Sequence, residues 1–309
     1  MYSTDKSDLL KTLCSIHAPS GNEDNMHFYL MQYITAHSST WKTIPTIFSG
    51  EGFQNSIILI FGNPRTAVYA HIDNIGFTVR YGNQLVKVGG PKTEDGYILT
   101  GKDSQGDIEC TLRKSEDGEL TYEFHREIER GTDLSFKHNW REDEETVQCC
   151  YMDNRLGVWS ALQLCETLTN GAIVFSCWEE HGGGSVAYLA KFLWKNYAIK
   201  KALISDITWA TEGVHLGKGV VISMRDSGIP RQQFVREIIE LAKESTVPFQ
   251  LEVESAGGSD GTELQKQPYP IDWCFIGAAE ENVHSPDEKV NKKDIEGMVE
   301  LYSYLLAKL

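Results

Sequence analysis

Long apolar runs are absent from this 309-residue sequence, and no stretch approaches the roughly 18 apolar residues that a membrane span requires. Basic residues are in deficit: 29 Lys and Arg stand against 44 Asp and Glu, for a formal net charge of −15. A surface that binds nucleic acid or anionic lipid needs clustered basic residues. We therefore expect no nucleic-acid partner and no membrane association.

The cysteines form neither a zinc-ribbon pattern nor a disulfide framework. There are seven, an odd number at irregular spacing, and no CxxC pair occurs. The first residues, Met1 to Leu13, lack the basic start and apolar core of a secretory signal. Both observations predict a reduced protein in the cytoplasm.

The sequence changes character along the chain. From residue 74 to 148, short runs rich in Val, Ile, Tyr and Thr alternate with Gly and Asp-Gly, as in a small all-β barrel or sandwich. From residue 149 onward, predicted strands alternate with predicted helices, which is typical of an α/β sheet covered by helices. We expect an α/β domain of residues 1–73 and 149–309, interrupted by a β insertion at 74–148.

Two local predictions concern the ends of elements. The spacing Ser20-x-x-Glu23 is a capping-box pattern and predicts the start of a helix. The expected strands of the α/β part lie at 66–70, 172–178, 202–205 and 272–277.

Polar residues that could bind a metal follow the predicted strands. Open α/β sheets place their sites just beyond the carboxyl ends of strands, so we expect these side chains to converge. The two imidazoles and five carboxylates concerned are His71, Asp73, Asp153, Glu179, Glu180, Asp206 and His284. Each alone has an ordinary alternative: a solvated histidine, an exposed Glu-Glu pair, or an Asp that caps a helix. Their shared position is what indicates a site.

These residue types suit zinc, manganese or cobalt with mixed nitrogen and oxygen ligands. Two neighbouring ions need one bridging carboxylate and two terminal ligands each. Five of the seven residues supply that count: His71, Asp153, Glu180, Asp206 and His284. Asp73 could then accept the imidazole N–H of His71, and Glu179 could serve as general base toward a metal-activated water.

At this point the chain resembles a known family, the glutamyl and tetrahedral aminopeptidases with dinuclear metal sites, some of which are called cellulase M or deblocking aminopeptidases. The resemblance runs over nearly the whole chain. It is carried, in order, by LLKTLCSIHAPSGNED, AHIDNIGFTV, MDNRLGVWSALQL, WEE, SDIT, LGKGVVISMRDSGIP, AGGSDGTE and HSPDEKVNKKDIEGM.

The resemblance implies a role for each residue. His71 and Asp206 resemble the terminal ligands of one ion, Glu180 and His284 those of the other, and Asp153 the bridge. Asp73 resembles the supporting carboxylate and Glu179 the general base. The implied fold is a mixed-sheet, helix-covered, zinc-peptidase-like α/β domain with a barrel-like β insertion.

The resemblance also implies two divalent ions, with zinc ahead of cobalt or manganese, peptide substrates, and a homo-oligomer formed or gated through the insertion. It places Gly258, Ser259 and Asp260 beside the substrate cleft, although a flexible turn is an equal alternative. The chain departs from the family pattern in a shortened insertion, in the residues after Thr208, and in the segment GAAEENV before His284, where the family commonly has an Arg-Tyr pair. Substrate preference therefore stays open.

The leading hypothesis is a metal-dependent aminopeptidase that removes N-terminal residues from peptides. A deacylase or amidohydrolase acting on N-acyl amino acids would use the same ligands, so the residues do not separate the two. A third hypothesis is a non-catalytic scaffold that binds metal or peptide. The presence of Glu179 argues against it, because a binder has no use for a base there.

Overall fold

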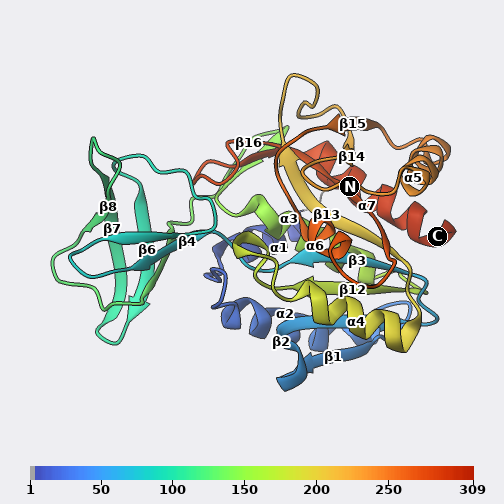
Figure 1. Ribbon diagram of the computed structural model, residues 1–309, viewed down its shortest axis with the longest axis horizontal. Coiled ribbons are helices and arrows are strands. Elements are labelled where there is room, and N and C mark those ends of the chain that lie inside the picture. The colour runs from blue at the N-terminus through green and yellow to red at the C-terminus, as the bar shows by residue number, and fades with distance from the viewer. Residues whose placement is uncertain (1–3) are drawn as a thin grey trace.

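The computed structural model describes residues 4–309, and its framework is two β-sheets (Figure 1). The larger has eleven strands: β1 (Thr46–Gly50), β2 (Gln54–Phe61), β3 (Thr66–His71), β10 (Arg141–Glu142), β11 (Thr146–Gln148), β12 (Gly171–Ser176), β13 (Lys201–Trp209), β14 (Val220–Arg225), β15 (Phe249–Val253), β16 (Asp272–Glu281) and β17 (Lys289–Asn291). Nine of them follow the order β1-β2-β12-β3-β13-β16-β17-β11-β10, and β14 pairs with both β16 and β15.

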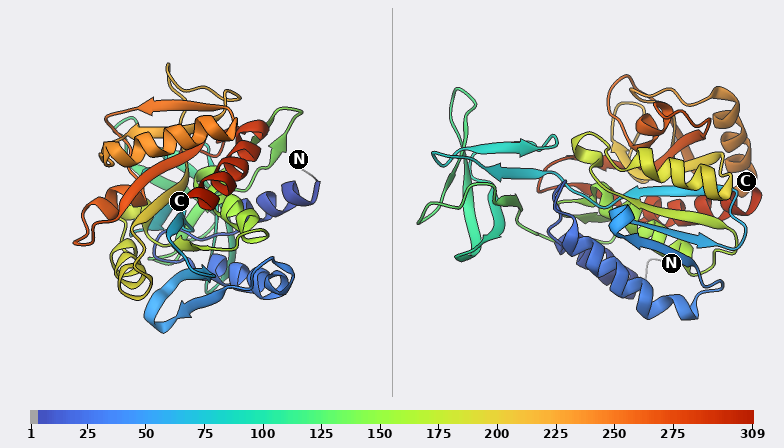
Figure 2. Two further views of the ribbon diagram at one scale, coloured as in Figure 1. Left: turned by 90° about the vertical axis from the view of Figure 1, so that its right-hand side faces the viewer. Right: turned by 60° about the horizontal axis from the view of Figure 1, so that its bottom comes forward.

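The smaller sheet is antiparallel and lies at one end of the molecule (Figures 1 and 2). Its six strands are β4 (Gly76–Val79), β5 (Leu85–Val88), β6 (Ile98–Asp103), β7 (Gly106–Lys114), β8 (Leu120–Glu123) and β9 (Asp133–Phe136). The predicted fold class, a mixed α/β unit carrying a small barrel-like β unit, is confirmed. Within the segment 74–148, β10 and β11 join the large sheet, because β11 pairs with β17.

Helices cover both faces of the large sheet. They are α1 (Thr4–Ser15), α2 (Asp24–His37), α3 (Met152–Cys165), α4 (Val186–Tyr197), α5 (Gln232–Ser245), α6 (Asp260–Gln265) and α7 (Lys292–Lys308), with short 3-10 helices at Ser38–Thr40, Glu51–Phe53 and Glu179–His181. Within residues 4–309, no helix combines the length and apolar character needed to cross a membrane.

The two covered faces explain the unbroken apolar run of β2. Its odd-numbered residues, such as Ile57 and Leu59, pack into the core beneath α1, α2, α3, α5 and α7. Its even-numbered residues, Ile58 and Ile60, pack into a second core beneath α4 and α6. Successive side chains of a strand point to opposite faces, so a strand buried on both sides is apolar throughout.

Four neighbouring strands, β12, β3, β13 and β16, run parallel, so their carboxyl ends lie along one edge of the sheet. Two of them are longer than predicted. β13 continues to Trp209 and β16 to Glu281, where we expected ends near residues 205 and 277. Polar residues near the site are therefore part of the strands, which holds them more rigidly than a loop would.

Helix α3 lies unusually close to β13, next to this edge. A Cβ atom at Gly157 would lie 2.1 Å from the carbonyl oxygen of Ser205 and 2.2 Å from Asn154 Oδ1. The Asn154 side chain fills the contact, since Nδ2 donates to the Ser205 carbonyl (2.8 Å) and Oδ1 accepts from the Gly157 N–H (2.8 Å). Only a glycine at position 157 allows this approach.

We therefore predict that Gly157→Ala lowers the free energy of unfolding by about 1–3 kcal/mol, the usual cost of overpacking a tight contact. Denaturant titration followed by circular dichroism would measure it. Gly52→Ala is the matched control, because Gly52 is exposed and a Cβ there meets nothing within 4 Å. Equal unfolding midpoints for wild type and Gly157→Ala would contradict the proposed packing.

Candidate metal centre

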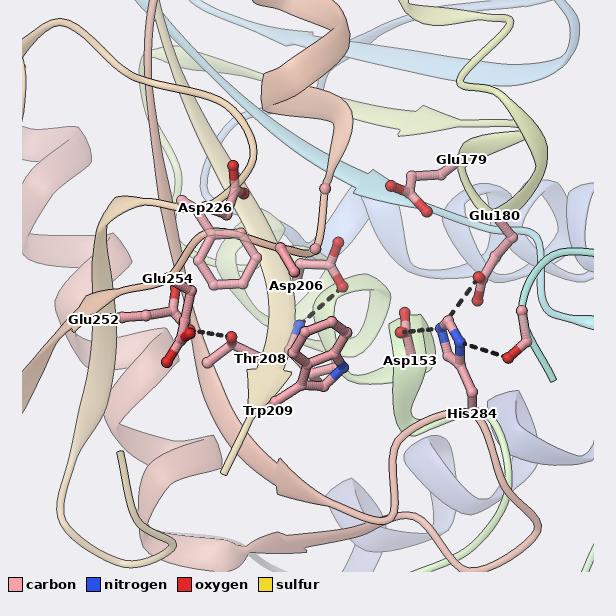
Figure 3. A pocket seen from close by; sticks show the side chains of 16 residues that line it. Asp153, Glu179, Glu180, Asp206, Thr208, Trp209, Asp226, Glu252, Glu254 and His284 are labelled. Atoms are coloured by element: carbon pink, nitrogen blue, oxygen red, sulfur yellow. Dashed lines mark hydrogen bonds and ion pairs between the residues drawn. The ribbon is translucent and has the colours of Figure 1, made fainter. Parts of the chain in front are cut away.

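Two groups of potential metal ligands lie at the carboxyl edge of the four parallel strands, and Figure 3 shows Asp153, Glu180, Asp206 and His284 among them. One consists of His71, Asp153 and Asp206, and the other of Asp153, Glu180 and His284. Within each group the candidate ligand atoms lie within 4.8 Å of one another. Asp153 belongs to both groups.

The two oxygens of Asp153 face different histidines. Oδ1 lies 3.1 Å from His71 Nε2, and Oδ2 lies 3.3 Å from His284 Nε2. His71 Nε2 is also 3.7 Å from Asp206 Oδ2, and His284 Nε2 is 3.3 Å from Glu180 Oε2. A carboxylate shared in this way has the arrangement that a bridging ligand between two ions requires.

Some of these residues lie at or after strand ends, and others lie inside a strand or a helix. His71 ends β3, Glu180 lies in the turn after β12, and His284 follows β16, as expected from the strand-end argument. Asp206 differs, because it lies inside β13 rather than after it. Asp153 differs as well: it lies at the start of α3, and β11 ends at Gln148.

Asp73 is fully buried and is hydrogen-bonded on both oxygens. Oδ1 accepts from the Glu179 N–H (3.1 Å) and lies 3.4 Å from His71 Nδ1. Oδ2 accepts from the Glu180 N–H (3.1 Å) and from Ser20 Oγ (2.5 Å). Burial alone would raise the pKa of Asp73, but the contacts with His71 outweigh it and lower that pKa.

The contact with Ser20 overturns the predicted capping box. Glu23 occupies the N-cap of α2 and no side chain caps that helix. Ser20 instead donates to Asp73, which lies 53 residues further along the chain. The Glu23 carboxylate accepts from the Gly21 N–H at 2.8 Å.

Glu179 lines the same cavity as the ligand groups, with Oε2 3.8 Å from His71 Nε2. Burial raises the pKa of Glu179 well above its usual value; His71 opposes the shift, and Glu180 and Asp206 add to it. Burial lowers the pKa of His284, but its bonds to Asp153 and Glu180 outweigh that effect and raise the pKa to about 12. The site thus packs like charges closely, with imidazoles between them.

The donor set fits divalent cations. Imidazole nitrogens and carboxylate oxygens are ligands of zinc, cobalt and manganese, and no thiol belongs to either group. Glu180 Oε1 is buried and has no hydrogen-bond partner in the described part of the chain. A buried carboxylate oxygen without a donor is unfavourable, and a cation would satisfy it.

Three residues support the site without belonging to either ligand group. Glu288 joins two candidate ligands, because Oε1 accepts from the His284 N–H (2.9 Å) and Oε2 from the Asp153 N–H (3.3 Å). Arg155 donates to the carbonyl of Ile72 and to Asn74 Oδ1, so it holds the turn after β3. The third is Ser20. Glu288 was not identified from the sequence, although it lies in the HSPDE segment that also contains His284.

The three residues predicted beside the substrate cleft, Gly258, Ser259 and Asp260, lie in different environments. Gly258 lines the cavity, whereas Ser259 Oγ accepts from the Gly261 N–H (3.1 Å) and caps α6. Asp260 is buried and accepts a short hydrogen bond from Ser176. Burial raises the pKa of Asp260 to about 6. Of the three, only Gly258 lines this cavity.

Comparison with known proteins identifies a family over most of the chain. A family model described as M42 glutamyl aminopeptidase matches residues 119–301. A curated protein from Acetivibrio thermocellus, provisionally named an aminopeptidase, is 25% identical over 97% of this chain and 98% of its own length.

Solved structures share the fold at low sequence identity. The aminopeptidase APDkam598 from Desulfurococcus kamchatkensis superposes with a TM-score of 0.88 at 18% identity, covering 99% of this chain and 95% of its own. The TET1 peptidase of Pyrococcus horikoshii, described as assembling into a tetrahedron or a large octahedral shell, gives 0.82 at 20% identity, covering 98% and 100%.

We predict that Asp153→Ala removes both bound ions, because Asp153 is the one residue shared by the two groups. Glu180→Ala should remove one. Metal content would be measured by mass spectrometry after loading with zinc and gel filtration, with circular dichroism to verify folding. Glu254→Gln is the control: Glu254 lines the cavity but belongs to neither group. Wild-type metal content in Asp153→Ala would refute the shared position.

Proposed function

The chain belongs to the M42 glutamyl aminopeptidase family, and we propose that it is a two-metal aminopeptidase that removes N-terminal residues from peptides. The observation that carries this proposal is the pair of ligand groups sharing Asp153, with Glu179 in the same cavity. A glutamate beside two cation sites is the arrangement for hydrolysis by an activated water.

In this proposal His71 and Asp206 hold one ion, Glu180 and His284 hold the other, and Asp153 contacts both. Zinc suits the donors best, and cobalt and manganese are alternatives. Two divalent ions bound there would lower the pKa of a water molecule and polarise the scissile carbonyl group.

Residues of the chain itself transfer the proton and position the other groups of the site. Glu179 accepts a proton from the attacking water at a carboxylate oxygen and delivers it to the nitrogen of the leaving peptide. Asp73 is a positioning residue, because it holds the N–H groups of Glu179 and Glu180 and faces His71 Nδ1. The acidic cavity attracts the free α-amino group of the substrate, which makes the reaction that of an exopeptidase.

We further propose that residues 1–73 and 149–309 form the catalytic domain and that the segment 74–148 mediates self-association. The small sheet projects from one end of the molecule and exposes Tyr81, Val86 and Ile98. Exposed apolar side chains of this size favour contact with another chain. The assemblies described for the P. horikoshii TET1 peptidase support a homo-oligomer.

The seven cysteines are free and buried, as expected for structural thiols in a reducing compartment. These thiols support our proposal that the protein is cytoplasmic.

Glu179→Gln should keep the metal content of the wild type and lower kcat by about 10²- to 10⁴-fold, because the amide cannot accept the proton. The assay would use aminoacyl anilides together with metal analysis. Glu281→Gln serves as the control, since Glu281 is exposed and pairs with Lys289 at 3.4 Å. Near-normal turnover in Glu179→Gln would overturn the base assignment.

A free α-amino group should be required in the substrate. We expect metal-loaded protein to hydrolyse aminoacyl anilides and to lose at least about 100-fold in kcat/KM on the same substrates after N-acetylation. A chelator should abolish the activity and added zinc should restore it. Preference for the acetylated substrates would support a deacylase instead, and metal binding without hydrolysis would support a scaffold.

A further inference from the structure

The cavity beside the ligand groups has a second acidic side. The cavity has a volume of about 240 Å³, and Asp226, Glu252 and Glu254 are among the residues that line it. Asp226 follows β14, Glu252 lies in β15 and Glu254 follows β15. In Figure 3 these three lie together on one side of the pocket, with Asp206 and Trp209 between them and His284. We call them the acidic wall.

Two residues of the acidic wall are buried, whereas Glu254 is only partly buried. Asp226 is 7% exposed and Glu252 is 3% exposed. Among the described residues, the Lys and Arg ion pairs involve other carboxylates, and the cavity lining contains neither Lys nor Arg. The nearby Arg225 donates its Nε to the main-chain carbonyl of Asp226 (3.2 Å) and forms no ion pair with a carboxylate of the wall, although its positive charge opposes the rise in the pKa of Asp226.

Each of the two buried carboxylates accepts a hydrogen bond from a neutral donor. Thr208 Oγ1 donates to Glu252 Oε1, and the Gly228 N–H donates to Asp226 Oδ1. Burial raises the pKa of both carboxyl groups, and the pKa of Glu252 is raised further by Asp226 and Glu254. Carboxylates buried together without a cation are unfavourable for folding. A ligand that brings a positive charge would relieve this repulsion.

The rest of the pocket suits a long side chain with a charged end. Trp209 lies between the acidic wall and His284 in Figure 3, and Phe275 also lines the cavity, so aromatic surface is available to a methylene stem. Lysine and arginine pack their stems along apolar surface and place the charged group at a polar site. Glutamate has the wrong sign of charge for this wall.

We propose that Asp226, Glu252 and Glu254 bind the side chain of the substrate's first residue and that this residue is lysine or arginine. The inference rests on the proposed function, because the ligand groups must hold the scissile peptide bond for the side chain to reach the acidic wall. It assigns a substrate class that the glutamyl name of the family does not.

The first test measures kcat/KM for lysyl, arginyl, leucyl and glutamyl anilides with the metal-loaded wild type. We expect lysyl and arginyl substrates to exceed leucyl by about tenfold or more, and glutamyl to be the poorest. Glu254→Gln should lower the lysyl-to-leucyl ratio by about tenfold, and Glu254→Lys should raise the glutamyl-to-lysyl ratio. Glu254 is chosen because it is only partly buried, so these variants are expected to fold.

Glu281→Gln removes one negative charge outside this cavity and should leave the lysyl-to-leucyl ratio unchanged. A wild type that prefers leucyl or glutamyl substrates would overturn the proposal. So would a ratio that Glu254→Gln and Glu281→Gln change equally.

A second readout does not depend on turnover. Calorimetry with the zinc-loaded Glu179→Gln protein would compare binding of lysinamide and leucinamide, and we expect about tenfold tighter binding of lysinamide. If no anilide is hydrolysed by the wild type, the proposed function fails, and this measurement still tests whether the acidic wall binds a basic side chain. Equal binding of the two amides would refute it.

Discussion

The buried carboxylate of Asp73 joins the parts of this site that come from distant stretches of the chain. It accepts from Ser20 before α2 and from the Glu179 and Glu180 N–H groups after β12, and it faces His71 at the end of β3. Because Asp73 is excluded from water, losing one of these donors would leave a buried charge unsatisfied. This one carboxylate therefore ties the turn that carries the proposed base and one proposed ligand to β3 and to the segment before α2.

The interior around the site is rich in carboxyl groups. Glu280 and Glu288 are buried beside the ligand groups, and neither oxygen of Glu280 has a hydrogen-bond partner among the described residues. Burial and neighbouring carboxylates raise the pKa of both groups well above the usual value. Folding such a region is unfavourable unless cations offset the charge, so metal and a basic substrate would stabilise the same cavity that they occupy.

Much of the fold could be predicted because apolar periodicity is local. The alternation of strands and helices after residue 149, and the β pattern before it, need only neighbouring residues to be recognised. The errors arose where a distant contact overrides the local pattern. Ser20 was predicted to cap α2, but Asp73 offers it a buried acceptor. β13 and β16 run further than predicted because their pairing continues through Asp206 to Trp209.

The sequence by itself determined which seven residues were candidates and that their types suit a metal, and the structure brings all seven to one edge of the sheet. Only the tertiary structure decided that Asp153 lies between two histidines, that Glu288 joins two candidate ligands, and that the acidic wall shares the cavity. The reason is physical. The sequence gives the type of each residue directly, whereas the burial of a side chain and its distance from other charged groups depend on segments that are far apart in sequence.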